Sequence, residues 1–348
     1  MSGMMKRAIL KKPLHLELED VPKATAEPGE VLVKVMRCGV CGSDFTIYKG
    51  KHPWAISPLV MGHEFAGIID SVGEGVDSSL VGERVGVLPH RICGNCYGCR
   101  RNASNLCSNL RCMGAEAHGG HAEYVSVPAN MAISIPDTLS FDEAALLEPA
   151  CVAYHGINRA GNIKGQTVCV IGAGPIGAFA VQSAVAQGAL KVIVCDLDDS
   201  RLKLSEQWAH KVFNTTNKSL SQALKDNGID SEQIDTYVDC VGLEGQILEQ
   251  ILLTSRRNTT IVMVGVLRRE YNIPHLPEFV QHEITLHGTT MYDHRDYAVM
   301  IALMADKKIR IGGMITHRFK LSDIPYVFER FSTSAQAYFK IMLDMAEQ

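Results

Sequence analysis

The segment TVCVIGAGPIG, residues 167–177, decides the fold of this chain. It starts as a continuous apolar run and ends with glycines at positions 172, 174 and 177. Residues 178–187 continue with a helical pattern, which Gly188 ends. A buried strand that turns through glycines into a helix predicts a βα unit, and G-x-G-x-x-G at that turn is typical of a dinucleotide site.

Each residue of this turn has a physical task in such a site. Gly172 permits the tight turn, Gly174 lets the backbone approach a pyrophosphate, and Gly177 lets the helix pack closely on the strand. The helix begins with Pro175 and Ile176, and its N-terminus offers unpaired N–H groups to phosphates. A flavin or a regulatory nucleotide could use the same fold, so the motif alone leaves the ligand open.

A second apolar strand, KVIVCD at 191–196, ends in Asp196, nineteen residues after Gly177. A carboxylate at this spacing hydrogen-bonds the ribose hydroxyls of the adenosine and repels a 2′-phosphate, so we expect NAD rather than NADP. Arg201 lies nearby and would favour a phosphate. The alternative for Asp196 is a simple cap on the helix that follows.

Further apolar runs at 235–242 and 259–265 continue the alternation of strands and helices, which predicts a parallel sheet. The first 150 residues differ, because valine-rich runs such as 30–40 and 65–76 are separated by glycine turns and predict a β-rich domain. The predicted class is therefore α/β, and 348 residues favour two domains.

The composition excludes several classes of protein. A formal charge of -4 and a pI near 6.4 argue against a nucleic-acid-binding surface. The start of the chain turns polar too soon for a signal peptide, and no apolar run is long enough to span a membrane. Eleven cysteines, an odd number, fit a reducing compartment, so we expect a cytoplasmic protein without membrane or nucleic-acid partners.

Four cysteines stand close together as C-x2-C-x2-C-x7-C, at Cys93, Cys96, Cys99 and Cys107. Four thiolates at such spacing close a tetrahedral shell around zinc and leave no open position, so we expect a structural zinc ion. The alternatives are an iron–sulfur cluster, or cysteines that are reduced, redox-active or paired in disulfides.

A second candidate metal site is spread along the chain. Cys41 lies in CGVCGSD, His63 and Glu64 lie in MGHEF, and Glu148 lies in LLEPACVAYH. Taken singly, each has an ordinary structural interpretation: a buried thiol, a core histidine and two acids.

The order of the motifs changes this interpretation. C-G-S-D, G-H-E, the four-cysteine segment, G-G-x-A-E-Y at 119–124, E-P and G-A-G-P-I-G follow one another along the chain. This order resembles the zinc-dependent medium-chain dehydrogenase/reductase family over essentially the whole chain. The E-P pair at 148–149 and I-T-H-R-F at 315–319 resemble its polyol branch, which includes sorbitol, galactitol and sugar-acid dehydrogenases.

The resemblance implies a GroES-like β-rich catalytic domain at 1–153, with the structural zinc at about 90–110. It also implies a Rossmann domain at 154–289 and a return to the catalytic domain at 290–348. The implied reaction is zinc-dependent oxidation of a secondary alcohol of a polyol or sugar acid, with hydride transfer to NAD. A homodimer or homotetramer with two zinc ions per subunit is implied as well.

By the same resemblance, Cys41 and His63 are ligands of a catalytic zinc, and Glu64 and Glu148 compete for the remaining protein position. Ser43 passes the substrate proton toward solvent. Relatives often have histidine where this chain has Thr46, which leaves Tyr48, His52 or a water chain for the next proton-transfer step.

Three side chains are weaker candidates for substrate contacts. Arg318 resembles a polyol-branch arginine that holds Glu148 or a substrate hydroxyl, with a solvated surface residue as the alternative. Trp54 either lines the pocket or packs in the core, and Tyr48 is a third candidate. His121 stands where relatives usually have phenylalanine.

Two rival functions fit much of the same pattern. The first is oxidation of an amino alcohol, as in the L-threonine 3-dehydrogenases. The second is a non-enzymatic NAD-binding protein on the same fold, against which the presence of Cys41, Ser43, His63 and Glu64 argues.

Overall fold

The computed structural model describes residues 3–242, 246–266, 276–333 and 338–345. The chain divides into two compact units: unit 1 contains Met1–Glu148 and Asp293–Gln348, and unit 2 contains Pro149–Tyr292. Unit 1 is therefore built from both ends of the chain. Among the described helices, none is both long enough and apolar enough to cross a bilayer.

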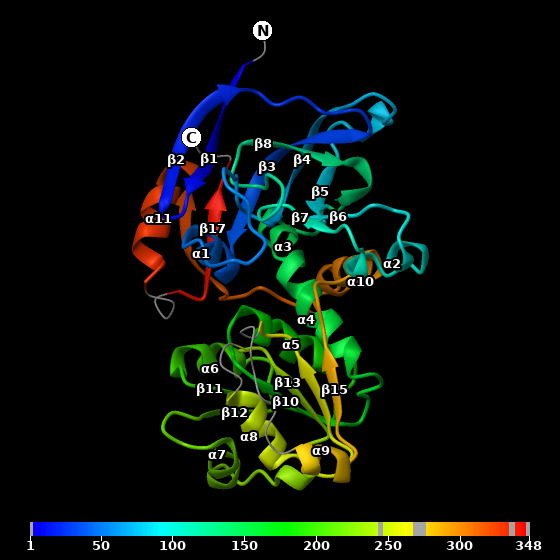
Figure 1. Cartoon of the computed structure of the whole chain (residues 1–348), viewed down its shortest axis with the longest axis vertical. Coiled ribbons are helices and arrows are strands. Elements are labelled where there is room, and N and C mark those ends of the chain that lie inside the picture. Colours follow the sequence, from blue (N-terminus) through cyan, green and yellow to red (C-terminus); the bar gives the residue numbers. More distant parts are fainter. Residues whose placement is uncertain (1–2, 243–245, 267–275, 334–337, 346–348) are drawn as a thin grey trace. The chain divides into compact units, whose positions relative to one another are not determined.

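Unit 2 contains a parallel sheet with the strand order β12-β11-β10-β13-β14-β15 (Figure 1). Its strands are β10 (Thr167–Ile171), β11 (Lys191–Asp196), β12 (Lys211–Asn214), β13 (Thr236–Asp239), β14 (Thr260–Met263) and β15 (Thr285–Gly288). Its helices include α5 (Pro175–Ala186), α6 (Asp199–Ser205), α7 (Leu220–Asp226), α8 (Gln246–Thr254) and α9 (Leu276–Gln281). This strand order is that of a Rossmann fold, and it reverses beside β10.

The apolar runs explain why these strands lie in the middle of the sheet. Every residue of β10 and of β13 is buried, as expected for parallel strands covered by helices on both faces. Tyr237 of β13 and Ile261 of β14 pack in one core cluster with Leu248 and Leu252 of α8. The continuous apolar runs and the helical spacing of the apolar residues between them were thus sufficient to predict this part of the fold.

Unit 1 is built on an antiparallel and mixed sheet with the strand order β16-β17-β3-β4-β5-β9, and β8 also pairs with β3. Its strands are β3 (Glu30–Val40), β4 (Glu64–Val72), β5 (Arg84–Val87), β8 (Tyr124–Pro128), β9 (Ala132–Ser134), β16 (Ile315–Lys320) and β17 (Lys340–Asp344). Two smaller pairs are β1 (Met4–Lys12) with β2 (His15–Pro22), and β6 (His90–Arg91) with β7 (Arg111–Cys112). The helices are α1 (Gly42–Tyr48), α2 (Tyr97–Arg100), α3 (Phe141–Ala145), α10 (His294–Ala305) and α11 (Ile324–Phe331), while α4 (Leu147–Arg159) crosses the boundary between the units.

Strand β3 has the central place in unit 1. The C-terminal strand β17 pairs with it on one side, and β4 pairs with it on the other. The register places Gly39 of β3 opposite both Met342 of β17 and Glu64 of β4. Residues 341–344 of β17 therefore lie next to residues of β3 that are about 300 positions away in sequence.

Candidate active site

Cys41 lies where β3 turns into α1, and it is the residue that precedes the first turn of that helix. Its backbone is extended, with φ −92° and ψ 158°, and its N–H donates to Oδ2 of Asp44 at 2.8 Å. This bond closes the first turn, so the position of the Cys41 thiol is determined by the end of a central strand and the start of a helix.

His63 stands just before β4 and is buried. Its Nδ1 lies 3.5 Å from Oδ1 of Asp44, a carboxylate with no exposure, and its Nε2 lies 3.4 Å from Oγ of Ser43. Burial opposes protonation, but the charges and hydrogen bonds of Asp44 and Cys41 together outweigh it and raise the pKa of His63 well above its usual value. A carboxylate on Nδ1 orients the ring and leaves Nε2 as the ligand atom, which is the usual arrangement of a metal-binding histidine.

Sγ of Cys41, a ring nitrogen of His63 and a carboxylate oxygen of Glu64 all lie within 4.8 Å of one another. Thiolate, imidazole and carboxylate together are a donor set that zinc accepts. Three residues that are up to 23 positions apart thus converge on a volume that one ion would fill.

Glu64 has a partner that sequence reasoning missed. Nζ of Lys340 on β17 lies 2.7 and 2.8 Å from the two carboxylate oxygens of Glu64, and both side chains are buried, at 3% and 0% exposure. Burial would lower the pKa of Lys340, but the charge and hydrogen bonds of Glu64, together with the charges of Cys41 and Glu148, outweigh it and raise that pKa above the ordinary value. Because 276 residues separate the two, no local spacing could have indicated the pair.

Gly39 makes this pair possible. A Cβ atom at this position would lie 2.1 Å from Oε2 of Glu64, so any larger residue would displace the carboxylate. Gly39 lies on β3, which runs between β17 and β4. Because Gly39 has no side chain, Nζ of Lys340 on β17 reaches the carboxylate of Glu64 on β4 across β3. The glycine of C-G-V-C therefore has a role in the site that was not predicted.

Glu148 is the other acid expected at the metal. It lies in the first turn of α4 and is buried, but it does not belong to the group formed by Cys41, His63 and Glu64. Burial raises the pKa of its carboxyl to about 7, partly offset by the charge of His63. The charges of Glu64 and Lys340 also act on it, which places Glu148 in the same electrostatic neighbourhood.

Several weaker candidates lie elsewhere than expected. Both terminal nitrogens of Arg318 contact Asp142 rather than Glu148. Tyr48 is a core residue whose ring packs on Phe328 at 5.3 Å, and its hydroxyl donates to the carbonyl of Leu14. These contacts correct the expectation that Arg318 holds Glu148, while contact of Arg318 or Tyr48 with a substrate stays a prediction.

Two residues of the segment after Ser43 are also informative. The Thr46 hydroxyl donates to the carbonyl of Gly42 at 3.3 Å, inside its own helix. Trp54 is 67% exposed and lies edge-on to His52 with ring centroids 5.8 Å apart, so it does not pack in the core. Nδ1 of His52 is buried without a partner among the described residues.

His121 lies in the core of unit 1 with no exposure. Neither ring nitrogen has a hydrogen-bond partner in the described part of the chain, and burial lowers the pKa of the imidazole to about 4. The ring lies edge-on to Phe328 at 6.0 Å and directly beside Gly62. His121 is thus a buried imidazole without hydrogen-bond partners among the described residues, packed against an aromatic ring.

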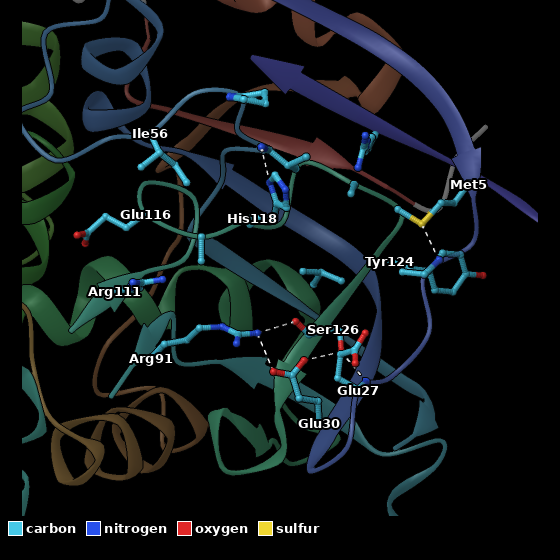
Figure 2. Close-up of a pocket in the computed structure, with 18 residues that line it drawn as sticks. Met5, Glu27, Glu30, Ile56, Arg91, Arg111, Glu116, His118, Tyr124 and Ser126 are labelled. Carbon is cyan, nitrogen blue, oxygen red and sulfur yellow. Dashed lines mark hydrogen bonds and ion pairs between the residues drawn. The ribbon is translucent and has the colours of Figure 1, made fainter. Parts of the chain in front are cut away.

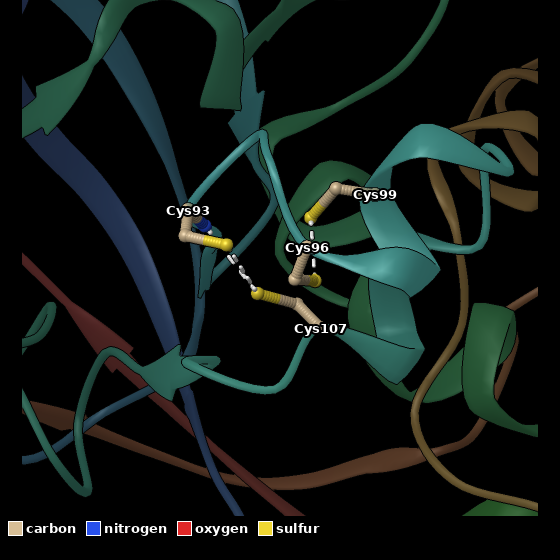
Figure 3. A group of neighbouring side chains, drawn as sticks. All are labelled: Cys93, Cys96, Cys99 and Cys107. Carbon is tan, nitrogen blue, oxygen red and sulfur yellow. Dashed lines mark hydrogen bonds between the residues drawn. The ribbon is translucent and has the colours of Figure 1, made fainter.

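The four cysteines of the second metal motif converge in the same way (Figure 3). Sγ of Cys96 lies 3.5 Å from Sγ of Cys99, and Sγ of Cys107 lies 3.5 Å from Sγ of Cys93. These distances exclude disulfides, whose S–S bonds are about 2 Å long, and they are near the roughly 3.8 Å of a tetrahedral Zn–S4 shell. Backbone N–H groups of Cys99 and Ser108 lower the pKa of Cys96 to about 5, which favours the thiolate that a metal requires.

The glycine-rich turn has the geometry of a nucleotide site. Gly172 has φ +95°, and a Cβ on Gly177 would lie 1.8 Å from the carbonyl oxygen of Gly172. Gly174 precedes α5, which starts with Pro175 and Ile176, and a Cβ there would meet only NH1 of Arg201, at 3.8 Å. The backbone at Gly174 is therefore open to a phosphate group, with a guanidinium nearby.

Asp196 holds this turn rather than capping the next helix. Its Oδ2 accepts the N–H of Ala173 at 2.6 Å, and its Oδ1 accepts those of Leu197 and Asp198. The side chain of Asp198 caps α6 instead. A carboxylate has about four acceptor positions, so Asp196 retains capacity for ribose hydroxyls.

Comparison with known proteins agrees with this geometry. Residues 27–137 match the alcohol dehydrogenase GroES-like domain, and residues 175–306 match the zinc-binding dehydrogenase family. Sorbitol dehydrogenase of Bacillus subtilis is 30% identical over 97% of this chain and 97% of its own length. This chain belongs to the zinc-type medium-chain dehydrogenase/reductase family.

Two further proteins that are similar to this chain extend the comparison. L-threonine 3-dehydrogenase of Pyrococcus abyssi is 32% identical, over 92% of this chain and 93% of its own. The crystal structure of an alcohol dehydrogenase (rspB) from Escherichia coli CFT073 in complex with NADH has a TM-score of 0.92 and 31% identity, over 99% of this chain and 100% of that one. The resemblance inferred from motif order and the GroES-like plus Rossmann fold are confirmed, and the family members support an alcohol dehydrogenase with a nicotinamide cofactor and zinc.

Proposed function

We propose that this protein is a zinc- and NAD-dependent dehydrogenase that oxidises a secondary alcohol of a polyol or sugar acid to the ketone. The observation that carries the proposal is the convergence of Cys41, His63 and Glu64 within 4.8 Å, with the hydroxyl of Ser43 3.4 Å from Nε2 of His63. This set supplies both metal donors and a hydroxyl for proton transfer at one place.

Each residue of the site has its own role in this reaction. Cys41 and His63 hold the catalytic zinc together with Glu64 or Glu148, and the bound ion supplies a Lewis acid that lowers the pKa of the substrate hydroxyl. Asp44 orients His63, and Lys340 orients Glu64. Ser43 would accept the hydroxyl proton and pass it toward solvent, and a bound nicotinamide would supply the acceptor for the carbinol hydrogen as hydride.

The cofactor is held by unit 2. The turn at Gly172, Gly174 and Gly177 and the start of α5 receive the pyrophosphate. Asp196 receives the ribose hydroxyls of NAD, since its carboxylate repels a 2′-phosphate. Arg201 lies near Gly174, where its guanidinium would add a positive charge beside the pyrophosphate.

Cys93, Cys96, Cys99 and Cys107 hold a second, structural zinc ion, because four thiolates leave no open position. The protein assembles as a homodimer or homotetramer, in which the sheet-edge strand β15 contributes to the contact. The polyol or sugar-acid substrate follows from the likeness to sorbitol dehydrogenase and from carboxylates at the catalytic metal, which suit hydroxyl-rich ligands.

The test is a screen for NADH formation with zinc-loaded protein. The panel contains neutral polyols, polyol phosphates, aldonates and L-threonine, each with NAD and with NADP. Turnover of a polyol or aldonate with NAD is expected, and His63→Ala should abolish it, whereas the matched surface variant His15→Ala should not. Turnover of L-threonine alone would support the amino-alcohol alternative, and turnover that persists in His63→Ala would contradict the zinc site.

The cofactor assignment has its own variant. Asp196→Ala should reduce the preference for NAD over NADP, because the charge that repels the 2′-phosphate is removed. An unchanged ratio of kcat/KM values for the two cofactors would contradict this role.

A further inference from the structure

Lys340 contacts two parts of the proposed zinc site at once. Its Nζ donates to both carboxylate oxygens of Glu64, at 2.7 and 2.8 Å, and to the carbonyl oxygen of Val40, at 3.4 Å. Val40 is the residue that precedes Cys41. One buried ammonium therefore holds the carboxylate of one candidate metal ligand and the backbone next to another.

Both buried acids of this site have a nitrogen partner within the chain. Asp44 and Glu64 have no exposure, and burial of a carboxylate is costly unless it is paired. Oδ1 of Asp44 lies 3.5 Å from Nδ1 of His63, while both oxygens of Glu64 contact Lys340. The side chains around the metal position are thus held by contacts that the chain itself provides.

A zinc ion in the proposed catalytic site has to share the carboxylate of Glu64 with Lys340. One oxygen of Glu64 lies within 4.8 Å of Sγ of Cys41 and of a ring nitrogen of His63. The ammonium contacts both oxygens of the same carboxylate, which has about four acceptor positions and can therefore contact two cations. The two cations nevertheless repel each other, and salt screens this repulsion only weakly at a buried site.

An antagonism of this kind is reciprocal. If a bound zinc ion weakens the contact between Lys340 and Glu64, Lys340 must weaken zinc binding by the same factor. Without the ammonium, the buried carboxylate of Glu64 would face no cation in the metal-free protein, and zinc would supply one. Removal of the ammonium should therefore raise the affinity for zinc while it destabilises the metal-free protein.

We propose that Lys340 takes the place of the catalytic metal ion: it neutralises Glu64 and keeps the ligand group assembled before zinc binds, and it lowers the affinity of the site for zinc. The inference rests on the zinc site of the proposed function and extends it to the way in which the site is loaded. Lys340 is here a positioning residue, since it acts on the metal through Glu64 and the backbone at Val40.

The sign of the effect separates this role from a simpler one. A residue that only orients a metal ligand improves metal binding, and its loss usually weakens the affinity by about 10–100-fold. Loss of a competing cation has the opposite effect. The zinc affinity of a Lys340 variant therefore distinguishes the two roles without any measurement of turnover.

The test compares zinc binding in Lys340→Met and in the unmodified protein. A chelator first removes the more weakly held zinc ion, and zinc is then titrated back in competition with a chelator of known affinity, without NAD or substrate. His63→Ala should abolish this rebinding, which assigns it to the catalytic site. We expect the dissociation constant for zinc to fall by at least about tenfold in Lys340→Met.

Thermal unfolding gives a second measurement. Zinc should raise the melting temperature of Lys340→Met by more than that of the unmodified protein, because a more tightly bound ligand stabilises the fold more. A Lys340→Met protein that folds only when zinc is supplied is the extreme form of this result. If the variant does not fold even with zinc, Lys340→Gln replaces it, because glutamine removes the charge but can still donate to Glu64.

The matched control is Lys23→Met. Nζ of Lys23 also contacts both oxygens of one carboxylate, that of Asp70, at 2.9 and 2.8 Å. Lys23 lies over the ring of Tyr124, which lines the cavity shown in Figure 2 rather than the group of candidate zinc ligands. Its replacement removes the same charge from unit 1, so the zinc affinity should stay unchanged in Lys23→Met.

The outcomes separate this inference from the proposed zinc site itself. Two zinc ions in the unmodified protein, with an affinity that is unchanged or weaker in Lys340→Met, would overturn the inference and leave the site in place. A single zinc ion in the unmodified protein would overturn both. Equal gains in affinity in Lys340→Met and Lys23→Met would show an effect of net charge alone, and would overturn the role of Lys340.

Discussion

At the scale of single residues, the ion pair of Lys340 and Glu64 distinguishes the zinc site of this chain. A buried ammonium and carboxylate stabilise each other only while both are present, and removing one leaves an uncompensated buried charge. The pair also places the Glu64 oxygens beside Cys41 and His63. Removal of one partner should therefore cost much more stability than removal of one partner of an ion pair on the surface.

The variant Lys340→Met tests this difference. We expect a loss of about 3–5 kcal/mol in the free energy of unfolding, measured with urea, because Glu64 is left charged and buried. The matched control is Lys6→Met, which breaks an exposed pair with Asp20 and should cost less than about 1 kcal/mol. Equal losses in the two variants would show that breaking the buried pair costs no more free energy of unfolding than breaking the exposed one.

His121 makes a second prediction at this scale, and it concerns pH. Its folded pKa of about 4 lies below the ordinary value of 6.5, so the unfolded chain binds the proton first as the pH falls. The contribution of the neutral His121 ring to the free energy of unfolding is thus fully present above about pH 6.5, and it is lost as the pH falls toward 4. His121→Phe should stabilise the protein at pH 5 more than at pH 8, by roughly 2 kcal/mol.

The measurement for His121→Phe is chemical unfolding of both proteins at the two pH values. The difference between variant and unmodified protein is the informative quantity, because other titrating groups cancel in it. A difference that is the same at pH 5 and pH 8 would contradict a neutral buried imidazole.

At the scale of elements, the contact of β10 with α5 determines the nucleotide turn. The Cβ of an alanine at position 177 would lie 1.8 Å from the carbonyl oxygen of Gly172, so helix and strand would have to separate. Gly177→Ala should weaken NAD binding by at least about tenfold, because the N–H groups of the turn lose their positions. The zinc content should stay unchanged, since all the proposed metal ligands lie in unit 1.

The matched control is Gly312→Ala, at an exposed position before β16. A Cβ at Gly312 would meet nothing within 4 Å, so NAD affinity, measured by fluorescence titration, should not change. Equal NAD affinity in Gly177→Ala and Gly312→Ala would refute the close packing as the basis of the site.

At the scale of the whole molecule, the two metal motifs should act independently. Elemental analysis should find two zinc ions per chain, and one each in Cys96→Ser and in His63→Ala. Cys96→Ser should mainly lower the melting temperature, because a closed four-thiolate shell stabilises its segment. His63→Ala should abolish turnover while NAD binding persists. A single zinc ion in the unmodified protein would contradict the two-site assignment.

Much of the fold followed from patterns within short stretches. The apolar runs 167–171 and 191–196 became β10 and β11, and the helix expected after Gly174 became α5. The paired strands β1 and β2 at the start of the chain were not predicted, because their burial is partial and irregular. The pairing of β17 with β3 was anticipated only as a return of the chain, without partners or register.

By itself, the sequence determined the sites whose members lie close along the chain. Four cysteines within 15 residues, or three glycines within six, converge because the short chain between them cannot separate them far. The tertiary structure alone decided that Lys340 holds Glu64 and that Arg318 contacts Asp142. These contacts depend on which strands pair and in what register, and that choice is made by the burial of the whole core rather than by any local spacing.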